Sequence, residues 1–123
     1  MEHLIIWIML SHWVADFLCQ TSWMAENKSK NFLALLSHGL VYTGMLAYMV
    51  MMLGGRMGME YTAMGMFILI NGLSHVGVDF FTSKITSYFW RTGRIHNFFV
   101  TIGLDQYIHF VILYVTMWVY LVP

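Results

Sequence analysis

The sequence has few charged residues, one cysteine and one proline, and each shortage excludes something. Only 10% of the 123 residues are charged, whereas a soluble domain carries about 25%. The formal net charge is zero, so we expect no nucleic-acid partner, which would require a field of one sign. The single cysteine, Cys19, cannot form an intrachain disulfide. The proline, Pro123, is the last residue and interrupts no apolar run.

Hydrophobic residues make up 59% of the chain and gather in four long runs. A helix that crosses a bilayer needs about 20 apolar residues, and every backbone group in it must pair internally. The runs therefore predict an integral membrane protein. We expect an all-α, up-down four-helix bundle that forms one transmembrane domain over residues 1–123. The predicted spans cover about residues 4–24, 32–53, 61–84 and 98–122.

The connections between these runs predict the orientation. The second connection holds a single basic residue, Arg56. By the positive-inside rule the first and third connections face the cytoplasm, so both termini lie outside. The basic residues of these two connections are Lys28, Lys30, Lys84, Arg91 and Arg94.

Residues 85–97 mix aromatic and basic side chains, which is typical of a short amphipathic piece at the headgroup level. Two interpretations are open. The segment is either an interfacial anchor or part of a clamp for an anionic headgroup or phosphate. The clamp would consist of Lys84, Arg91 and Arg94.

Ionisable side chains lie within the apolar runs, where they are expensive and by default mark a function. His12, Asp16 and Gln20 are four residues apart and share one helix face. Asn71, His75 and Asp79 repeat this four-residue spacing. The ionisable set comprises His12, Asp16, His38, His75, Asp79, Asp105 and His109.

Depth predicts that these seven groups meet. With 1.5 Å per residue and alternating helix directions, all seven fall roughly 7–18 Å from the cytoplasmic end of their runs. The histidine is the deeper member of each His–Asp pair on the first, third and fourth runs. Helices of opposite direction thus place the same groups in the same layer, which predicts one shared site.

Imidazole nitrogen and carboxylate oxygen together suit a divalent metal, zinc first, with iron or manganese as alternatives. Seven candidate ligands exceed the three or four of one catalytic zinc. The site therefore holds either two ions, or one ion with aspartates that orient histidines. An aspartate that does not bind metal is a candidate catalytic base, which leaves Asp16, Asp79 and Asp105. We expect surrounding hydrogen bonds from Gln20, Asn71 and Gln106.

Four stretches carry a specific pattern: HWVADFLCQTSWMAENKSK (12–30), LLSHGLVY (35–42), NGLSHVGVDFFTSK (71–84) and LDQYIHF (104–110). They resemble a family of small bacterial and phage membrane proteins catalogued as domain of unknown function 3307. The resemblance covers nearly the whole chain and implies a location in the bacterial inner membrane. The segment GLSHVGVDFFT (72–82) is also similar to YdjM-like inner-membrane proteins, described as metal-dependent hydrolases. The chain lacks their Arg-Gly-Xaa-Thr-His element.

Three functions follow from these patterns. The first is a metal-dependent membrane hydrolase of a lipid or lipid-linked substrate. The second is a non-catalytic metal or proton site in an ion-handling subunit, although the apolar outer halves of the runs favour a one-sided pocket over a pore. The third is a structural or partner subunit, as a homo-oligomer or within a larger membrane assembly. Close helix contacts are expected at Gly39, Gly44 and Gly72.

Overall fold

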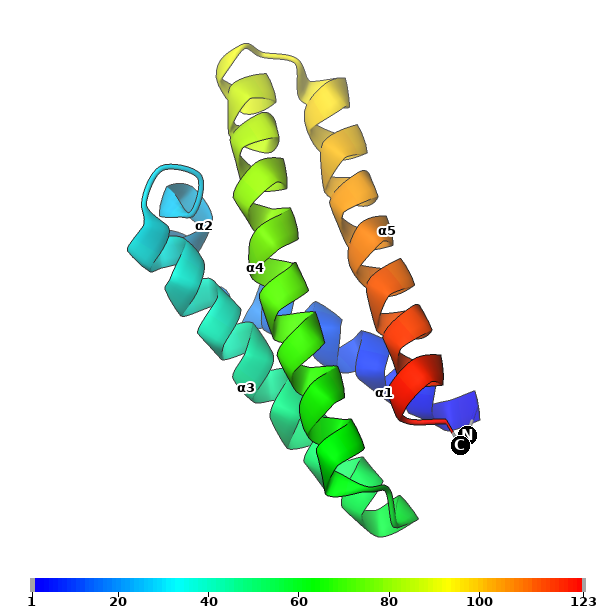
Figure 1. Cartoon of the computed structure of the whole chain (residues 1–123). Coiled ribbons are helices and arrows are strands. Elements are labelled where there is room, and N and C mark those ends of the chain that lie inside the picture. Colours follow the sequence, from blue (N-terminus) through cyan, green and yellow to red (C-terminus); the bar gives the residue numbers. More distant parts are fainter. Residues whose placement is uncertain (1, 123) are drawn as a thin grey trace.

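The computed structural model describes residues 2–122 and confirms the all-α class (Figure 1). Five α-helices and one π-helical segment follow one another within this range. They are α1 (Glu2–Trp13), the π segment (Val14–Leu18), α2 (Ser22–Asn27), α3 (Phe32–Met57), α4 (Tyr61–Arg91) and α5 (Ile95–Tyr120).

Helices α3, α4 and α5 run in alternating directions, each packed against the next (Figure 1). Helix α1 lies behind them in this view and contacts α3 and α5. These four helices therefore surround a common interior. Among the described residues, α3, α4 and α5 are long and apolar enough to cross a membrane.

The first predicted span, 4–24, is not one helix, and this expectation is wrong. Helix α1 passes into the π segment, where the Cys19 amide donates to the Val14 carbonyl five residues back, at 2.9 Å. The chain then turns, and Thr21 begins α2 by accepting a hydrogen bond from the Met24 amide. The apolar helical stretch His3–Leu18 is shorter than α3, α4 and α5.

We expected a separate interfacial segment at residues 85–97, and this expectation is also wrong. Helix α4 continues without a break to Arg91, and α5 already begins at Ile95. With 31 residues α4 is roughly 46 Å long, more than the roughly 30 Å of a bilayer core. The turn between the helices uses Gly93 at φ 69°, a left-handed conformation that favours glycine. The basic residues of this region therefore sit at helix ends.

The start of α4 is fixed by Glu60, whose side chain accepts a hydrogen bond from the Ala63 amide. The Thr62 hydroxyl also donates to this carboxylate. The hydroxyl and the amide favour the charged form and hold the pKa of Glu60 below its usual value. Glu60 thus ends the short turn that follows Gly58 and leads into the longest helix.

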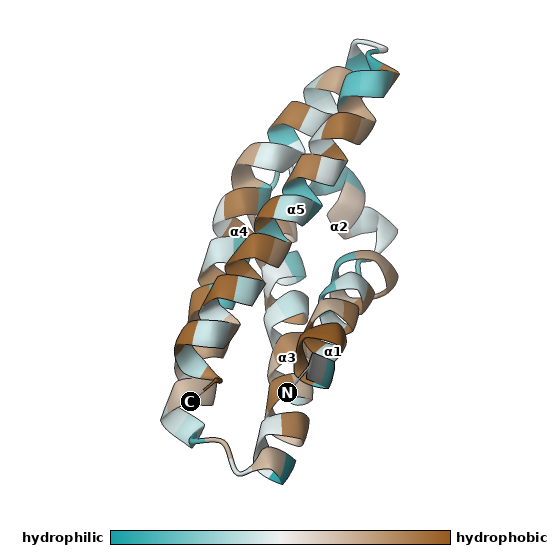
Figure 2. Cartoon of the chain, turned by 90° about the vertical axis from the view of Figure 1, so that its right-hand side faces the viewer, coloured by the Kyte–Doolittle hydropathy of each residue, from teal (hydrophilic) through white to brown (hydrophobic). Residues whose placement is uncertain are grey.

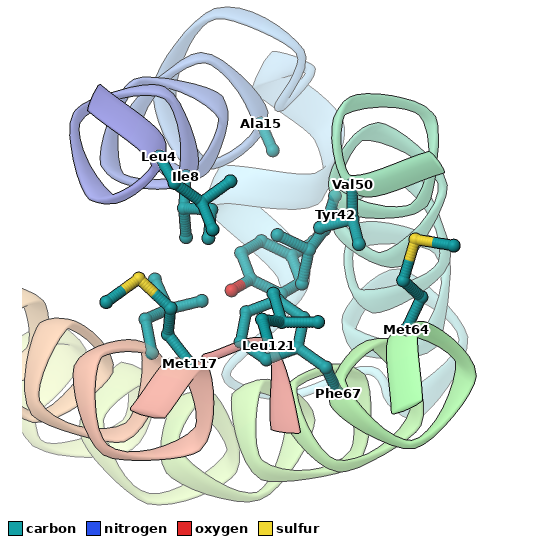
Figure 3. Close-up of a cluster of buried hydrophobic side chains, with 11 residues drawn as sticks. Leu4, Ile8, Ala15, Tyr42, Val50, Met64, Phe67, Met117 and Leu121 are labelled. Atoms are coloured by element: carbon teal, nitrogen blue, oxygen red, sulfur yellow. The ribbon is translucent and has the colours of Figure 1, made fainter. Parts of the chain in front are cut away.

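The interior is divided into an apolar half and a polar half. Figure 3 shows the apolar part, where Tyr42 and Phe67 lie among aliphatic side chains from α1, α3 and α5. The polar half holds buried histidines and aspartates. The apolar cluster comprises Leu4, Ile8, Ala15, Tyr42, Leu46, Val50, Met64, Phe67, Leu113, Met117 and Leu121.

The outer surface is apolar as well. Hydrophobic residues, coloured brown in Figure 2, occur along the long helices, and many of them are exposed. Side chains such as Ile6, Leu40, Leu73 and Val119 are at least 60% exposed. Apolar surface of this extent marks contact with lipid or with other proteins.

Two of the three expected glycine contacts are present. A Cβ atom on Gly39 would collide with the side chain of Val76, and one on Gly72 would lie 2.6 Å from Thr43 Oγ1. Both contacts join α3 to α4, so glycine lets these helices approach closely. Gly44 has no described atom within 4 Å of such a Cβ, and its expected role is not borne out.

Candidate metal centre

The seven predicted ionisable residues converge in the polar half of the interior. They come from α1, the π segment, α3, α4 and α5. Six are at most 5% exposed, and Asp105 is the most accessible at 13%. The residues are His12, Asp16, His38, His75, Asp79, Asp105 and His109.

Four of them form a compact group whose donor atoms have the spacing of metal ligands. His38 Nε2 lies 2.9 Å from Asp16 Oδ1, 3.2 Å from Asp79 Oδ2 and 3.1 Å from His75 Nε2. His75 Nε2 lies 3.6 Å from Asp16 Oδ1 and 3.8 Å from Asp79 Oδ2. Ligands 2.0–2.1 Å from a tetrahedral ion are roughly 3.3 Å apart. These four residues could therefore hold a metal ion.

A second group shares Asp79 with the first. Asp79 Oδ1 lies 3.2 Å from His109 Nε2, while its other oxygen faces His38. His109 Nε2 is also 3.5 Å from Asp105 Oδ1. The three residues Asp79, Asp105 and His109 lie close enough to hold an ion, with fewer ligands than the first group. Asp79 thus connects the first group to an Asp105–His109 pair.

His12 belongs to neither group. Its Nε2 lies 3.1 Å from Gln106 Oε1 and 3.8 Å from Asp16 Oδ2. His12 therefore lies beside the groups and contacts them through Gln106 and Asp16.

Of the three residues expected to surround the ligands, Gln106 does so. Its amide nitrogen donates to Asp16 Oδ2 at 2.5 Å and to Asp105 Oδ2 at 3.2 Å. Asn71 instead donates to the Phe67 carbonyl and to Thr116, away from the groups. Gln20 has a buried Oε1 without a hydrogen-bond partner among residues 2–122.

The π segment explains how Asp16 reaches the site. A π turn is wider than an α turn and commonly occurs at functional sites. Asp16 sits in its middle, 5% exposed, and its two oxygens contact His38 and Gln106. The i, i+4 spacing from His12 predicted a shared helix face, and the π segment was missed because helical periodicity does not reveal it.

The His75 ring stacks on Tyr42, while its Nε2 contacts His38 and its Nδ1 has no hydrogen-bond partner in the described part of the chain. The Tyr42 ring lies parallel to it, with centroids 3.7 Å apart and planes 3° from parallel. The Nδ1 atoms of His12, His38 and His75 are buried without a hydrogen-bond partner in the described part of the chain. Metal-binding histidines usually donate this N–H to an outer partner. Here Tyr42 takes over the orienting role for His75.

Lys28 is part of the site although the sequence predicted it only as a topology signal. Its ammonium donates a 2.7 Å hydrogen bond to Asp79 Oδ2, and its side chain is 18% exposed. A carboxylate oxygen has two lone pairs, so Asp79 Oδ2 can accept this bond and also bind an ion. Lys28 belongs to the motif of residues 12–30, which also contains His12 and Asp16. The turn between the π segment and α2 brings its side chain back to Asp79.

A pocket of about 200 Å³ opens beside the groups. Asp16 and Asp105 line it on the ligand side, and Lys28 lines it from the end of α2. Ser83 and Gln20 also face it. Of the predicted aspartates, Asp16 and Asp105 are therefore the two that a molecule in the pocket can reach.

Two of the three residues predicted to form a basic clamp line the same pocket. Lys84 and Arg91 line a second pocket of about 760 Å³, together with Lys30. Lys84 Nζ also lies 3.5 Å above the Phe80 ring. Arg94 does not line this pocket and instead lies over the Tyr88 ring.

The family model described as "Protein of unknown function (DUF3307)" matches residues 4–123. The chain belongs to this family. No curated protein and no solved structure shows a significant match to it.

Proposed function

We propose that this DUF3307 protein is a membrane-embedded metalloprotein whose buried centre hydrolyses an ester bond of a lipid or lipid-linked substrate. The observation that carries the proposal is the first ligand group. Donor atoms of Asp16, His38, His75 and Asp79 meet at ligand spacing in a buried interior. They come from the π segment, α3 and α4, so three separate segments of the chain converge on one point.

Charge supports one divalent ion. The site holds three carboxylates and one ammonium, that of Lys28, which leaves two negative charges when the histidines are neutral. Buried charge is costly unless it is paired. One divalent cation makes the site neutral, and zinc suits its mixed nitrogen and oxygen ligands, with iron or manganese as alternatives. We place the ion in the first group and leave Asp105 and His109 free for proton transfer.

The ion would polarise the scissile bond and activate a water molecule as nucleophile. The residues around it would supply the rest. Asp105 is the most exposed of the three aspartates at the site, lines the pocket and takes the proton of the attacking water. Thr82 and Gln106 donate to Asp105 and fix its orientation. The departing alcohol receives that proton, and Lys28 stabilises negative charge at the pocket wall.

The membrane setting is supported by three helices of sufficient length and by the apolar outer surface. The apolar cluster fills the half of the interior that holds neither ligand group. A pocket on one side of the membrane therefore fits better than a continuous pore. By the positive-inside rule we place this pocket toward the cytoplasm of a bacterial inner membrane. We place both termini outside, which requires the shorter apolar helix His3–Leu18 to cross as well.

The experiment is turnover of a bacterial lipid extract by purified protein, with and without added zinc. We expect metal-dependent release of product by the wild type and none by Asp105→Asn, which should still be folded and still bind one ion. His96 is exposed and belongs to neither group, so His96→Ala serves as the matched control and keeps full activity. Failure to cleave any lipid class would contradict the enzyme.

A non-catalytic role is the second candidate, and the Lys28–Asp79 ion pair favours it. The Lys28 ammonium neutralises part of the negative charge of the carboxylates. Such an ion pair can stabilise the fold without any catalytic role. In that case the protein would be an ion-handling or structural subunit, as a homo-oligomer or in a larger membrane assembly. Bound metal without turnover would support this role.

A further inference from the structure

The second pocket adjoins the first and differs from it in charge. Both are lined by Ala25, Thr86 and Phe98, so they are neighbours near the end of α4. The inner pocket lies against the metal-ligand groups, and the outer pocket is rimmed by basic residues. A ligand that fills both pockets therefore reaches the centre with one end.

The basic residues of the outer pocket are not neutralised by the protein. Lys30, Lys84 and Arg91 form no salt bridge among the described residues. Lys84 and Arg91 are seven residues apart on α4 and share its face, while Lys30 approaches from the turn after α2. One carboxylate, that of Glu26, also lines the pocket, so positive charge prevails.

The inner pocket contributes an unused hydrogen-bonding group. Ser83 is 5% exposed, and its buried Oγ has no hydrogen-bond partner within residues 2–122. A buried hydroxyl without a partner is costly, and a ligand oxygen in the pocket would satisfy it. Trp90 and Phe98 add apolar surface to the rim of the outer pocket.

We propose that the two neighbouring pockets bind a phosphate-bearing lipid headgroup, with the phosphate against Lys30, Lys84 and Arg91. Phosphate oxygens accept charge-assisted hydrogen bonds from lysine and arginine, and the aromatic rim suits the adjoining acyl region. This inference rests on the proposed function for the claim that the bound lipid is a substrate. It narrows that substrate to phospholipids or lipid-linked phosphates.

The test measures binding of short-chain phosphatidic acid to the detergent-solubilised full chain. Diacylglycerol with the same tails is the comparison ligand, and inorganic phosphate is the competitor. We expect saturable binding of phosphatidic acid, with affinity for diacylglycerol lower by about tenfold or more. The variant Lys84→Gln/Arg91→Gln should lose a similar factor. Arg56→Gln, which changes a basic residue outside both pockets, should bind like the wild type.

Equal affinity for diacylglycerol, or unchanged binding by the folded double variant, would overturn the inference. Displacement by inorganic phosphate at the same concentration as phosphatidic acid would assign the pocket to free phosphate and overturn the lipid assignment. Metal content is measured on the same samples. A wild-type protein without metal that still binds phosphatidic acid would refute the metal centre and leave the lipid pocket in place.

Discussion

The Nε2 atoms of His38 and His75 face each other across 3.1 Å, although the two residues belong to different helices. Two imidazoles can share one proton at this distance, or both can direct lone pairs at one ion. Asp16 Oδ1 and Asp79 Oδ2 each lie within 4 Å of both Nε2 atoms. With these two oxygens the imidazoles make up a set of four groups that could hold a metal ion.

Asp79 and Asp105 have different proposed roles, and amide substitutions should separate them. Asp79→Asn removes one ligand and the carboxylate that also faces His109, so the bound ion should be lost. Asp105 lies outside the first group, so the variant Asp105→Asn should keep one ion per chain. Metal analysis of both purified variants checks this. Loss of metal from Asp105→Asn with retention in Asp79→Asn would reverse the assignment.

Tyr42 should matter through its ring and not through its hydroxyl. The ring stacks on His75 at 3.7 Å, so Tyr42→Leu removes the contact that orients this imidazole. We expect zinc affinity to fall about 10–100-fold, as for other residues that orient metal ligands. Tyr42→Phe keeps the ring and should bind zinc like the wild type. Competition with a chelator measures both, and equal weakening by the two substitutions would assign the effect to the hydroxyl.

The contribution of Lys28 to the stability of the protein should be largest when metal is absent. Its ammonium pairs with Asp79 at 2.7 Å, and removal of one partner from a buried pair costs about 3–5 kcal/mol. Because Lys28 is 18% exposed, we expect Lys28→Gln to destabilise the metal-free protein by about 3 kcal/mol. The zinc-loaded protein should lose less, since the ion also balances Asp79. Thermal unfolding with and without chelator tests this, and equal losses in both states would argue against shared neutralisation.

Gly39 and Gly44 lie on the same helix, and replacing each by alanine should change the stability in opposite directions. A Cβ at Gly39 collides with Val76, so Gly39→Ala should destabilise the helix pair by about 1–3 kcal/mol. Gly44 has open space, and alanine there should stabilise α3 by up to about 1 kcal/mol. Unfolding of the two variants in the same detergent provides the comparison. A stabilising Gly39→Ala would show that α3 and α4 are not tightly packed there.

The sequence predicts much of the site because membrane depth and helix periodicity constrain it strongly. An imidazole or carboxylate in an apolar run must face the interior, and rise per residue then places His38, His75 and Asp79 at one level. The structure brings these groups within 4 Å of one another. The same reasoning puts Asn71 on the correct face but one turn too far, where Thr116 is its partner.

The remaining features depend on contacts that local patterns do not contain. The π segment Val14–Leu18 has only five residues, which is too short to leave a hydrophobic period of its own in the sequence. The basic and aromatic residues at 85–91 read as a separate surface helix, because the end of a long helix that leaves the apolar layer has the same composition. Lys28 reaches Asp79 over 51 residues of sequence separation through the turn at 19–21, which periodicity does not predict.

The metal content of the purified full-length protein tests the central claim most directly. Elemental analysis, without added metal or chelator, should find one divalent ion per chain in the wild type. It should find none in His75→Ala and one in the control His96→Ala. A wild type without stoichiometric metal, or a His75→Ala protein that keeps its ion, would contradict the proposed centre.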